Sequence, residues 1–225
     1  MKISPLTKQL ITEGFLKTAI RAPSQLNLPP GAMRFALEQL CRAIPKNPDV
    51  QVRRLRMAGL RAEELKPQRQ STQLIFHIHG GAFFLGSLNT HRAFLTQVAA
   101  RTQMQVLHLD YPLSPEHPYP EALDALFDAY CQLLDQGIQA KDIILSGDSC
   151  GANLALALAL RIQKDALPQV SGLILMSPFL DLTLSSESLR FNRKHDALLS
   201  IEALEAGIDD FRAGILPGDK AAAVD

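Results

Sequence analysis

The sequence carries no excess charge of either sign, because 23 Lys and Arg residues balance 23 Asp and Glu residues. Acidic and basic residues are mixed along the chain, and nothing resembles the basic stripe that contacts a phosphate backbone. We therefore expect no nucleic-acid partner.

Long apolar runs are also missing. The longest, residues 154–160, is far below the roughly 20 residues that a membrane-spanning helix needs. The first 19 residues mix Lys2, Lys8, Glu13 and Lys17 with apolar residues, and they lack the continuous apolar core and cleavage site of a signal peptide. These absences predict a cytoplasmic protein with no membrane span.

Cysteines are few. Cys41, Cys131 and Cys150 form an odd set with no CxxC pair and no histidine at metal-ligand spacing. Reduced thiols are the simplest interpretation, so we expect neither disulfides nor a zinc or other metal site.

What the sequence does have is a regular alternation of strands and helices. An apolar fraction of 47% in 225 residues is enough for one domain with a buried core. Helices are expected over 7–20, 30–44, 91–101, 121–136 and 152–164, and strands over 73–78, 105–109, 142–146 and 172–176, with an edge hairpin at 50–61. This order predicts the α/β class, with a mostly parallel, doubly covered sheet.

One junction in this pattern has a chemical meaning. Residues 147–151, Gly-Asp-Ser-Cys-Gly, separate an apolar strand from a strongly helix-forming run. A G-x-S-x-G sequence between a strand and a helix is typical of a nucleophile elbow, in which a strained turn exposes the serine hydroxyl. Ser149 is therefore the candidate nucleophile, and an ordinary strand-turn-helix junction is the alternative.

A second glycine-containing loop lies upstream. A buried strand at 73–78 runs into His79-Gly80-Gly81-Ala82. Backbone N–H groups of such a loop, with the N–H of the residue after the nucleophile, can stabilise the oxyanion of acyl transfer. The candidate oxyanion hole is thus formed by Gly80, Gly81, Ala82 and Cys150.

Three stretches together carry a family resemblance: His-Gly-Gly-Ala-Phe-Phe at 79–84, Asp-Tyr-Pro-Leu-Ser-Pro-Glu-His-Pro-Tyr-Pro at 110–120, and Gly-Asp-Ser-Cys-Gly-Ala-Asn-Leu-Ala at 147–155. In order and spacing the chain resembles the hormone-sensitive-lipase-like family of α/β-hydrolases, bacterial esterases marked by an HGGG loop and a GDSAGG elbow. The resemblance extends from the N-terminus to about residue 216.

The resemblance implies an α/β-hydrolase fold in which residues 1–225 form a single domain, incomplete at its C-terminus. Residues 1–48 would supply N-terminal cap helices, and 181–215 a second cap segment in which Ser200 begins a helix. Five apolar side chains are candidate walls of an acyl pocket, with ordinary core packing as an equal alternative: Phe83, Phe84, Phe179, Leu180 and Phe211.

The implied activity is hydrolysis of a small-molecule carboxylic ester. Ser149 would attack the carbonyl carbon, a histidine would take the serine proton, and a carboxylate would orient that histidine. No metal or organic cofactor is implied.

The chain also departs from the family pattern. Ala82 stands in place of the third loop glycine, and Cys150 and Ala152 replace the elbow's usual alanine and last glycine. The family's acid and histidine follow the serine in chain order, and no matching segment follows 217–220. We therefore expect a C-terminally truncated product or part of a longer esterase.

The histidines do not restore the triad. Only His195 follows Ser149, and beside Asp196 it is expected to be an exposed polar residue. His79 as the direct base is an alternative, although in this family that histidine is thought to shape the loop. His77 and His108 lie in apolar strand runs and are expected to be hydrogen-bonded core residues.

Other functions stay open on the sequence alone. One is an inactive homologue that at most binds an apolar acyl ligand, or a partner protein through an exposed sheet edge. Another is a lactone hydrolase that uses the same nucleophile. A homodimer is also an open alternative.

Overall fold

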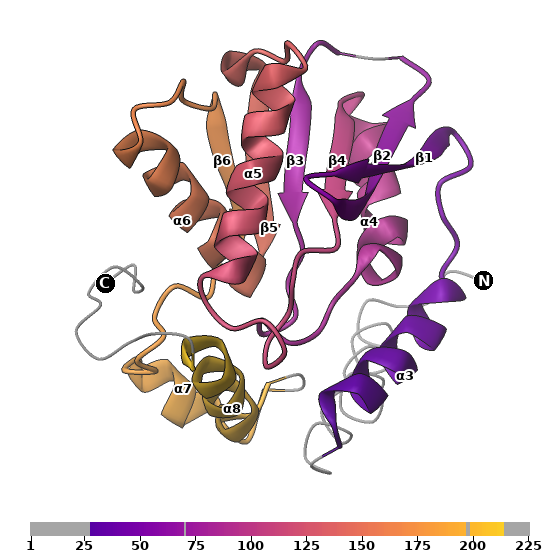
Figure 1. Ribbon diagram of the computed structural model, residues 1–225. Helices are drawn as coiled ribbons and strands as arrows, with labels where there is room; N and C mark the ends of the chain where they lie inside the picture. The colour runs from indigo at the N-terminus through magenta and orange to yellow at the C-terminus, as the bar shows by residue number, and fades with distance from the viewer. Residues whose placement is uncertain (1–27, 70, 197–198, 214–225) are drawn as a thin grey trace.

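The computed structural model describes residues 28–69, 71–196 and 199–213 of the chain (Figure 1). The helix expected over 7–20 lies outside these residues, as does most of the expected cap segment 1–48. The described residues form one six-stranded sheet in the order β1-β2-β4-β3-β5-β6.

The strands are β1 Val50–Met57, β2 Leu60–Pro67, β3 Leu74–Ile78, β4 Gln105–Leu109, β5 Ile143–Asp148 and β6 Gly172–Met176. The helices are α3 Pro30–Arg42, α4 Leu88–Thr102, α5 Glu121–Asp135, α6 Cys150–Lys164, α7 Glu187–Asn192 and α8 Ile201–Arg212, with a short 3₁₀ turn, η2, at Ala140–Asp142.

The sheet is mostly parallel, as predicted. Strands β4, β3, β5 and β6 run parallel, and β1 and β2 form an antiparallel hairpin at one edge. The hairpin is longer than the expected 50–61, because β2 continues to Pro67. It turns at Ala58 and Gly59, which have φ of 48° and 77°, as the tight turns of two-residue hairpins require.

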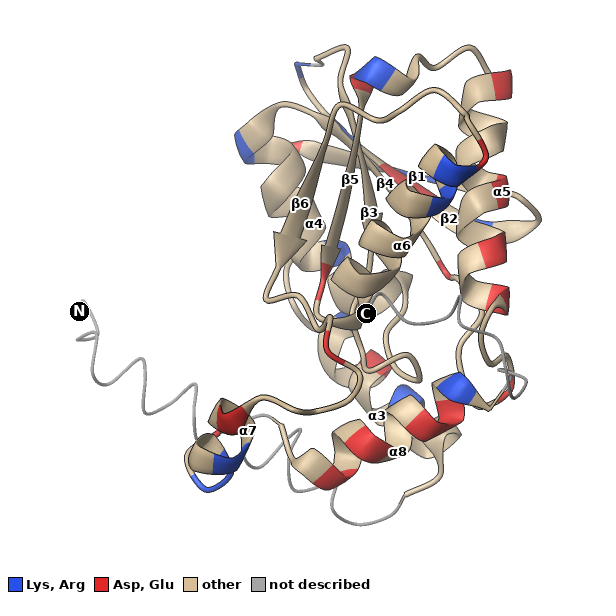
Figure 2. Ribbon diagram, turned by 90° about the vertical axis from the view of Figure 1, so that its left-hand side faces the viewer, with Lys and Arg blue, Asp and Glu red and all other residues tan. Residues whose placement is uncertain are grey.

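Helices cover both faces of the sheet. Figure 2 shows α4 on one side and α5 with α6 on the other. All five residues of β3 are buried, as expected for a central parallel strand that packs on both faces. One apolar cluster, which includes Leu95, Ala99 and Val106, joins α4 to the sheet, and a larger cluster lies under α5 and α6.

Strand β6 is the last strand on its side of the sheet among the described residues. Leu173 and Ile174 on this strand are 38% and 44% exposed. A parallel strand is normally covered on both faces, so β6 is unusually exposed for a strand of this kind.

Helices α3, α7 and α8 gather beyond the carboxyl ends of the parallel strands (Figure 1). Ser200 caps α8 as predicted, since its hydroxyl accepts the N–H of Ala203 at 3.2 Å. Among the described helices, none is long and apolar enough to cross a bilayer.

Candidate active site

Ser149 lies on a tight turn between β5 and α6. Its backbone has φ of 53° and ψ of −123°, a conformation that is strained for any residue with a side chain. The turn is possible because Gly147 and Gly151 lack side chains: a Cβ on Gly147 would lie 2.3 Å from the Gly151 carbonyl oxygen. The strand ends at Asp148, two residues later than expected, and the helix begins at Cys150, so Ser149 stands at the helix N-terminus.

The turn is held in place from the β6 side. The N–H of Ser149 donates to the Met176 carbonyl at 3.0 Å, and the Ser149 carbonyl accepts the N–H of Phe179 at 3.1 Å. Asn153 of α6 donates from its amide to the Phe179 carbonyl at 3.1 Å. These hydrogen bonds therefore attach the end of β6 and the segment after it to the turn at Ser149.

The loop after β3 approaches the elbow closely. Its residues Gly81, Ala82 and Phe83 all have positive φ, of 133°, 51° and 66°. The N–H of Phe83 donates to the Cys150 sulfur at 3.1 Å, and the N–H of Gly80 donates to Oδ1 of Asp148 at 3.0 Å. The structure thus brings together all the residues that the sequence suggested for an oxyanion hole: Gly80, Gly81, Ala82 and Cys150.

Cys150 is fully buried behind this loop. Burial raises the pKa of its thiol to about 12, so the sulfur is a neutral acceptor for the Phe83 N–H. Cys150 places an oxidisable thiol next to the candidate oxyanion site. The structure makes its thiolate rare, and the thiolate is the reactive form.

Asp148 forms a polar cluster that the sequence analysis missed. Its carboxylate lies 3.2 Å from Nε2 of His77 and 3.3 Å from Nε2 of His91. Burial works against ionisation, but the two adjacent histidine rings hold the pKa of Asp148 well below its usual range. A Cβ on Gly80 would lie 2.3 Å from Oδ2 of Asp148, so the glycine makes room for this carboxylate.

The buried histidines are largely as expected. Nδ1 of His77 lies 3.2 Å from the Ser146 hydroxyl, which confirms a hydrogen-bonded core residue. The expectation is wrong in part for His108, which is buried but forms no hydrogen bond through either ring nitrogen with the described residues. Its Nε2 lies 3.4 Å from Glu63, and burial lowers the pKa of His108 to about 4. Burial is therefore the main influence on the titration of this histidine.

His79 supports the loop from behind. Its ring stacks on Tyr111, with centroids 4.3 Å apart, and Nδ1 lies 2.9 Å from the Gly80 carbonyl. Burial lowers its pKa to about 3. Among the described residues, no histidine hydrogen-bonds to the Ser149 hydroxyl. His195 is exposed near the end of the α7 region.

Helix α8 packs against the oxyanion loop. The rings of Phe83 and Phe211 stack with centroids 3.9 Å apart, and the two residues are only 2% and 3% exposed. A Cβ on Gly207 would lie 2.8 Å from the Ala82 carbonyl oxygen. Of the five candidate pocket walls, Phe83 and Phe211 are therefore core residues, whereas Phe84, Phe179 and Leu180 are partly exposed.

Arg34 of α3 joins the far side of the same loop to the segment after β4. Its Nε donates to the Phe84 carbonyl at 2.7 Å and Nη2 to the Ser114 carbonyl at 2.6 Å. Its guanidinium also pairs with Glu116 at 2.7 Å. Two helices, α3 and α8, thus contact the loop beside Ser149.

The described residues contain no group of three or more His, Cys, Asp and Glu side chains arranged to hold a metal ion. The chemistry that the site offers comes from one serine on a strained turn and from backbone N–H groups beside it. These are the parts that acyl transfer uses.

Comparison with known proteins agrees with this geometry. A family model described as the alpha/beta hydrolase fold matches residues 75–222. An esterase of Acinetobacter venetianus is 67% identical over 220 residues, which are 97% of this chain and 73% of that protein. The carboxylesterase/phospholipase LipF of Mycobacterium tuberculosis is 31% identical over 189 residues, and this chain spans about half of its length, 49%.

Solved structures show the same relationship. An esterase from the bacterial hormone-sensitive lipase family superposes with a TM-score of 0.87 at 27% identity, over 99% of this chain and 74% of that one. A hormone-sensitive lipase from a metagenome library gives 0.86 at 31% identity, over 95% and 70%. The chain belongs to the α/β-hydrolase fold family and, within it, to the hormone-sensitive-lipase-like esterases.

Proposed function

We propose that this chain supplies the nucleophile and the oxyanion hole of a serine carboxylesterase. One observation carries the proposal: Ser149 has φ of 53° at the start of α6, directly beside a loop whose Phe83 N–H is bonded to the next residue, Cys150. A strained turn exposes the hydroxyl, and the first turn of a helix leaves N–H groups free for an anion.

The reaction follows from these positions. The Ser149 oxygen forms a bond to the ester carbonyl carbon, and the carbonyl π pair moves onto oxygen. The N–H groups of Cys150 and of the loop residues Gly81 and Ala82 stabilise that oxyanion. The N–H of Gly80, which the sequence also suggested as a donor, is already given to Asp148 at 3.0 Å. Collapse expels the alkoxide, which takes the proton lost by serine, and water then releases the carboxylic acid and restores Ser149.

The proton needs an acceptor. No described histidine contacts the Ser149 hydroxyl, so the proposal requires a histidine and an orienting carboxylate from outside the described contacts. His79 is a poor candidate, because its pKa of about 3 makes it a weak base and its Nδ1 faces the Gly80 carbonyl. We assign His79 to the support of the loop.

The test is hydrolysis of p-nitrophenyl butyrate by two proteins: the 225-residue chain, and a chimera that adds the unmatched part of the Acinetobacter esterase. Ser149→Ala is expected to lower kcat about 10⁶-fold in whichever form is active. Ser188→Ala is the matched control, because Ser188 is an exposed serine whose hydroxyl contacts only Ser186 among the described residues. Equal activity of wild type and Ser149→Ala would refute the nucleophile.

Further measurements on the same proteins distinguish the remaining alternatives. γ-Butyrolactone beside the open-chain ester separates lactone from ester hydrolysis. Butyrate that raises the melting temperature without any turnover in the chimera would favour an inactive, acyl-binding homologue. A homodimer and a cytoplasmic location stay predictions, to be checked by light scattering and by cell fractionation.

A further inference from the structure

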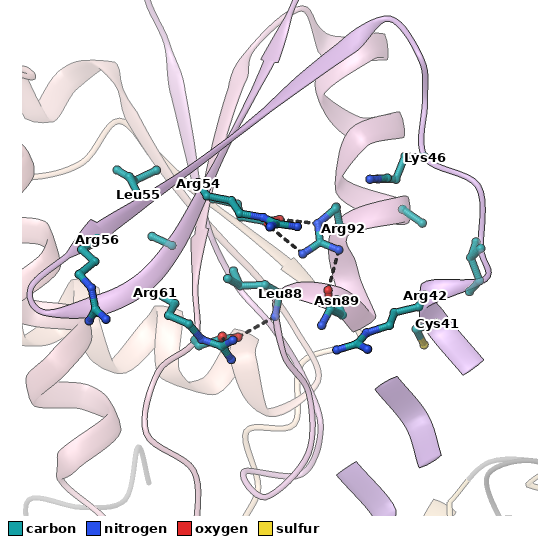
Figure 3. A pocket seen from close by; sticks show the side chains of 15 residues that line it. Cys41, Arg42, Lys46, Arg54, Leu55, Arg56, Arg61, Leu88, Asn89 and Arg92 are labelled. Carbon is teal, nitrogen blue, oxygen red and sulfur yellow. Dashed lines mark hydrogen bonds and ion pairs between the residues drawn. The ribbon is translucent and has the colours of Figure 1, made fainter. Parts of the chain in front are cut away.

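A cavity of about 570 Å³ lies away from Ser149, between the end of α3, the β1–β2 hairpin and α4 (Figure 3). Neither the proposed nucleophile nor the oxyanion loop lines it. Its walls come from four separate elements and from Asp110 after β4, so the fold itself holds the cavity open.

The lining is strongly cationic. Six basic side chains face the cavity: Arg42, Lys46, Arg54, Arg56, Arg61 and Arg92. Only two carboxylates, Glu63 and Asp110, line it with them. Because the whole chain has a formal net charge of zero, this excess of positive charge is a local concentration.

Both carboxylates are already neutralised by lining residues. Glu63 is 1% exposed and accepts two hydrogen bonds from Arg92, at 2.6 Å each. Burial opposes its ionisation, but the nearby His108 ring and the hydrogen bonds from Arg92 lower the pKa of Glu63 to about 2, so it stays charged. Asp110 lies 2.6 Å from Nη2 of Arg61.

The other cations have weaker or no partners. Arg54 lies 3.6 Å from Glu63, whose oxygens Arg92 already uses. Arg56 donates to the Gly59 carbonyl at 2.7 Å and forms no ion pair with any residue in the described ranges. Lys46 has no ion pair with any described residue, and Arg42 pairs at 3.1 Å with Glu38, which is not part of the lining.

Guanidinium groups match the geometry of phosphate and carboxylate oxygens, and several cations around one hollow repel each other until an anion enters. We propose that this cavity binds a small molecule with two or more phosphate or carboxylate groups. The Arg92–Glu63 pair fixes one wall, and Lys46, Arg54 and Arg56 supply the free positive charge. The site is separate from the proposed ester-hydrolysis site.

Calorimetric titration with tripolyphosphate at 150 mM NaCl tests the proposal. We expect saturable binding at one site, weakened at least tenfold by the double substitution Lys46→Gln and Arg56→Gln. The matched control is Arg101→Gln with Lys141→Gln, which removes the same charge from exposed positions outside the cavity. The control is expected to keep the wild-type affinity.

The alternative outcomes are distinct. Three outcomes would overturn the site: no saturable binding, an unchanged affinity in the cavity variant, or an equal loss of affinity in both double variants. The last outcome would show that net charge alone explains binding. Sedimentation with phosphatidylglycerol vesicles separates a lipid surface from a soluble anion. Vesicle binding that depends on Lys46 and Arg56, without tripolyphosphate binding, would also overturn the small-anion site.

Discussion

Nε2 of His77 lies 3.2 Å from the carboxylate of Asp148, the residue directly before the proposed nucleophile. The same carboxylate accepts the N–H of Gly80 at 3.0 Å. One partly buried side chain therefore connects the central strand β3, the elbow and the oxyanion loop. We infer that Asp148 positions the loop, because it accepts the Gly80 N–H and has no hydrogen bond to the Ser149 hydroxyl among the described residues.

The first prediction concerns this positioning role. Asp148→Ala removes the acceptor for the Gly80 N–H, and we expect kcat in the active form to fall by about 10- to 100-fold, toward the loss seen when one oxyanion donor is removed. Asp148→Asn keeps an oxygen acceptor and is expected to recover part of that loss. Exposed Asp135 supplies the control Asp135→Ala. A rise in KM with unchanged kcat would contradict the positioning role.

The second prediction concerns acid stability. Burial lowers the pKa of His79 to about 3 in the folded chain, whereas an unfolded histidine titrates near 6.5. Its contribution to folding is therefore complete above about pH 6.5 and is lost progressively as the pH falls toward 3. Each such histidine adds a slope of at most about 1.4 kcal/mol per pH unit to the free energy of unfolding.

Urea unfolding at pH 7, 6 and 5 measures that slope. His79→Phe keeps a ring against Tyr111 and should reduce the slope, although buried His108, whose pKa is also lowered, still contributes to it. His117→Phe changes a half-exposed histidine paired with Glu121 and is the control. The same slope in His79→Phe and wild type would contradict the prediction.

The third prediction concerns the contact of α8 with the oxyanion loop. Alanine is a better helix former than glycine by about 1 kcal/mol, but a Cβ at position 207 would lie 2.8 Å from the Ala82 carbonyl oxygen. Gly207→Ala is therefore expected to lower both the melting temperature and kcat. Gly31→Ala in α3, where a Cβ meets no atom within 4 Å, should lower neither.

The fourth prediction concerns Ala82, which replaces a glycine of the family motif. Its φ of 51° lies in the left-handed region, which costs a residue with a Cβ about 1–2 kcal/mol. Ala82→Gly relieves this strain but makes the unfolded chain more flexible, so we expect a stability change within about 1 kcal/mol and undiminished kcat. Ala166→Gly, at an exposed position with φ of 53°, is the control. A loss of kcat on Ala82→Gly alone would show that the alanine side chain itself is needed.

The sequence predicted those parts of the candidate site that are formed by residues adjacent in the chain. The elbow at Ser149 and the loop at Gly80 were found because glycines and a change of periodicity lie next to each other in the chain. Asp148 was missed because its partners His77 and His91 are 71 and 57 residues away, and their meeting depends on how β3, α4 and β5 are arranged. Arg34 and Gly207 were missed for the same reason, since both act through contacts with distant loops.

Local patterns also could not separate pocket walls from core residues. Phe83 and Phe211 have the same apolar character as Phe179, but their stacking closes them off from solvent. The cationic cavity was equally hidden, because its basic residues are spread over positions 42–92 and come together only through the packing of α3, the hairpin and α4.

The exposed edge of β6 affects how this polypeptide behaves at high concentration. Leu173 and Ile174 present apolar area beside backbone N–H and carbonyl groups that no described strand pairs. Such an edge can add a strand from any neighbouring molecule. Recovery of folded material during purification should therefore fall with protein concentration, and a lysine at either position should improve it by making edge-to-edge pairing unfavourable.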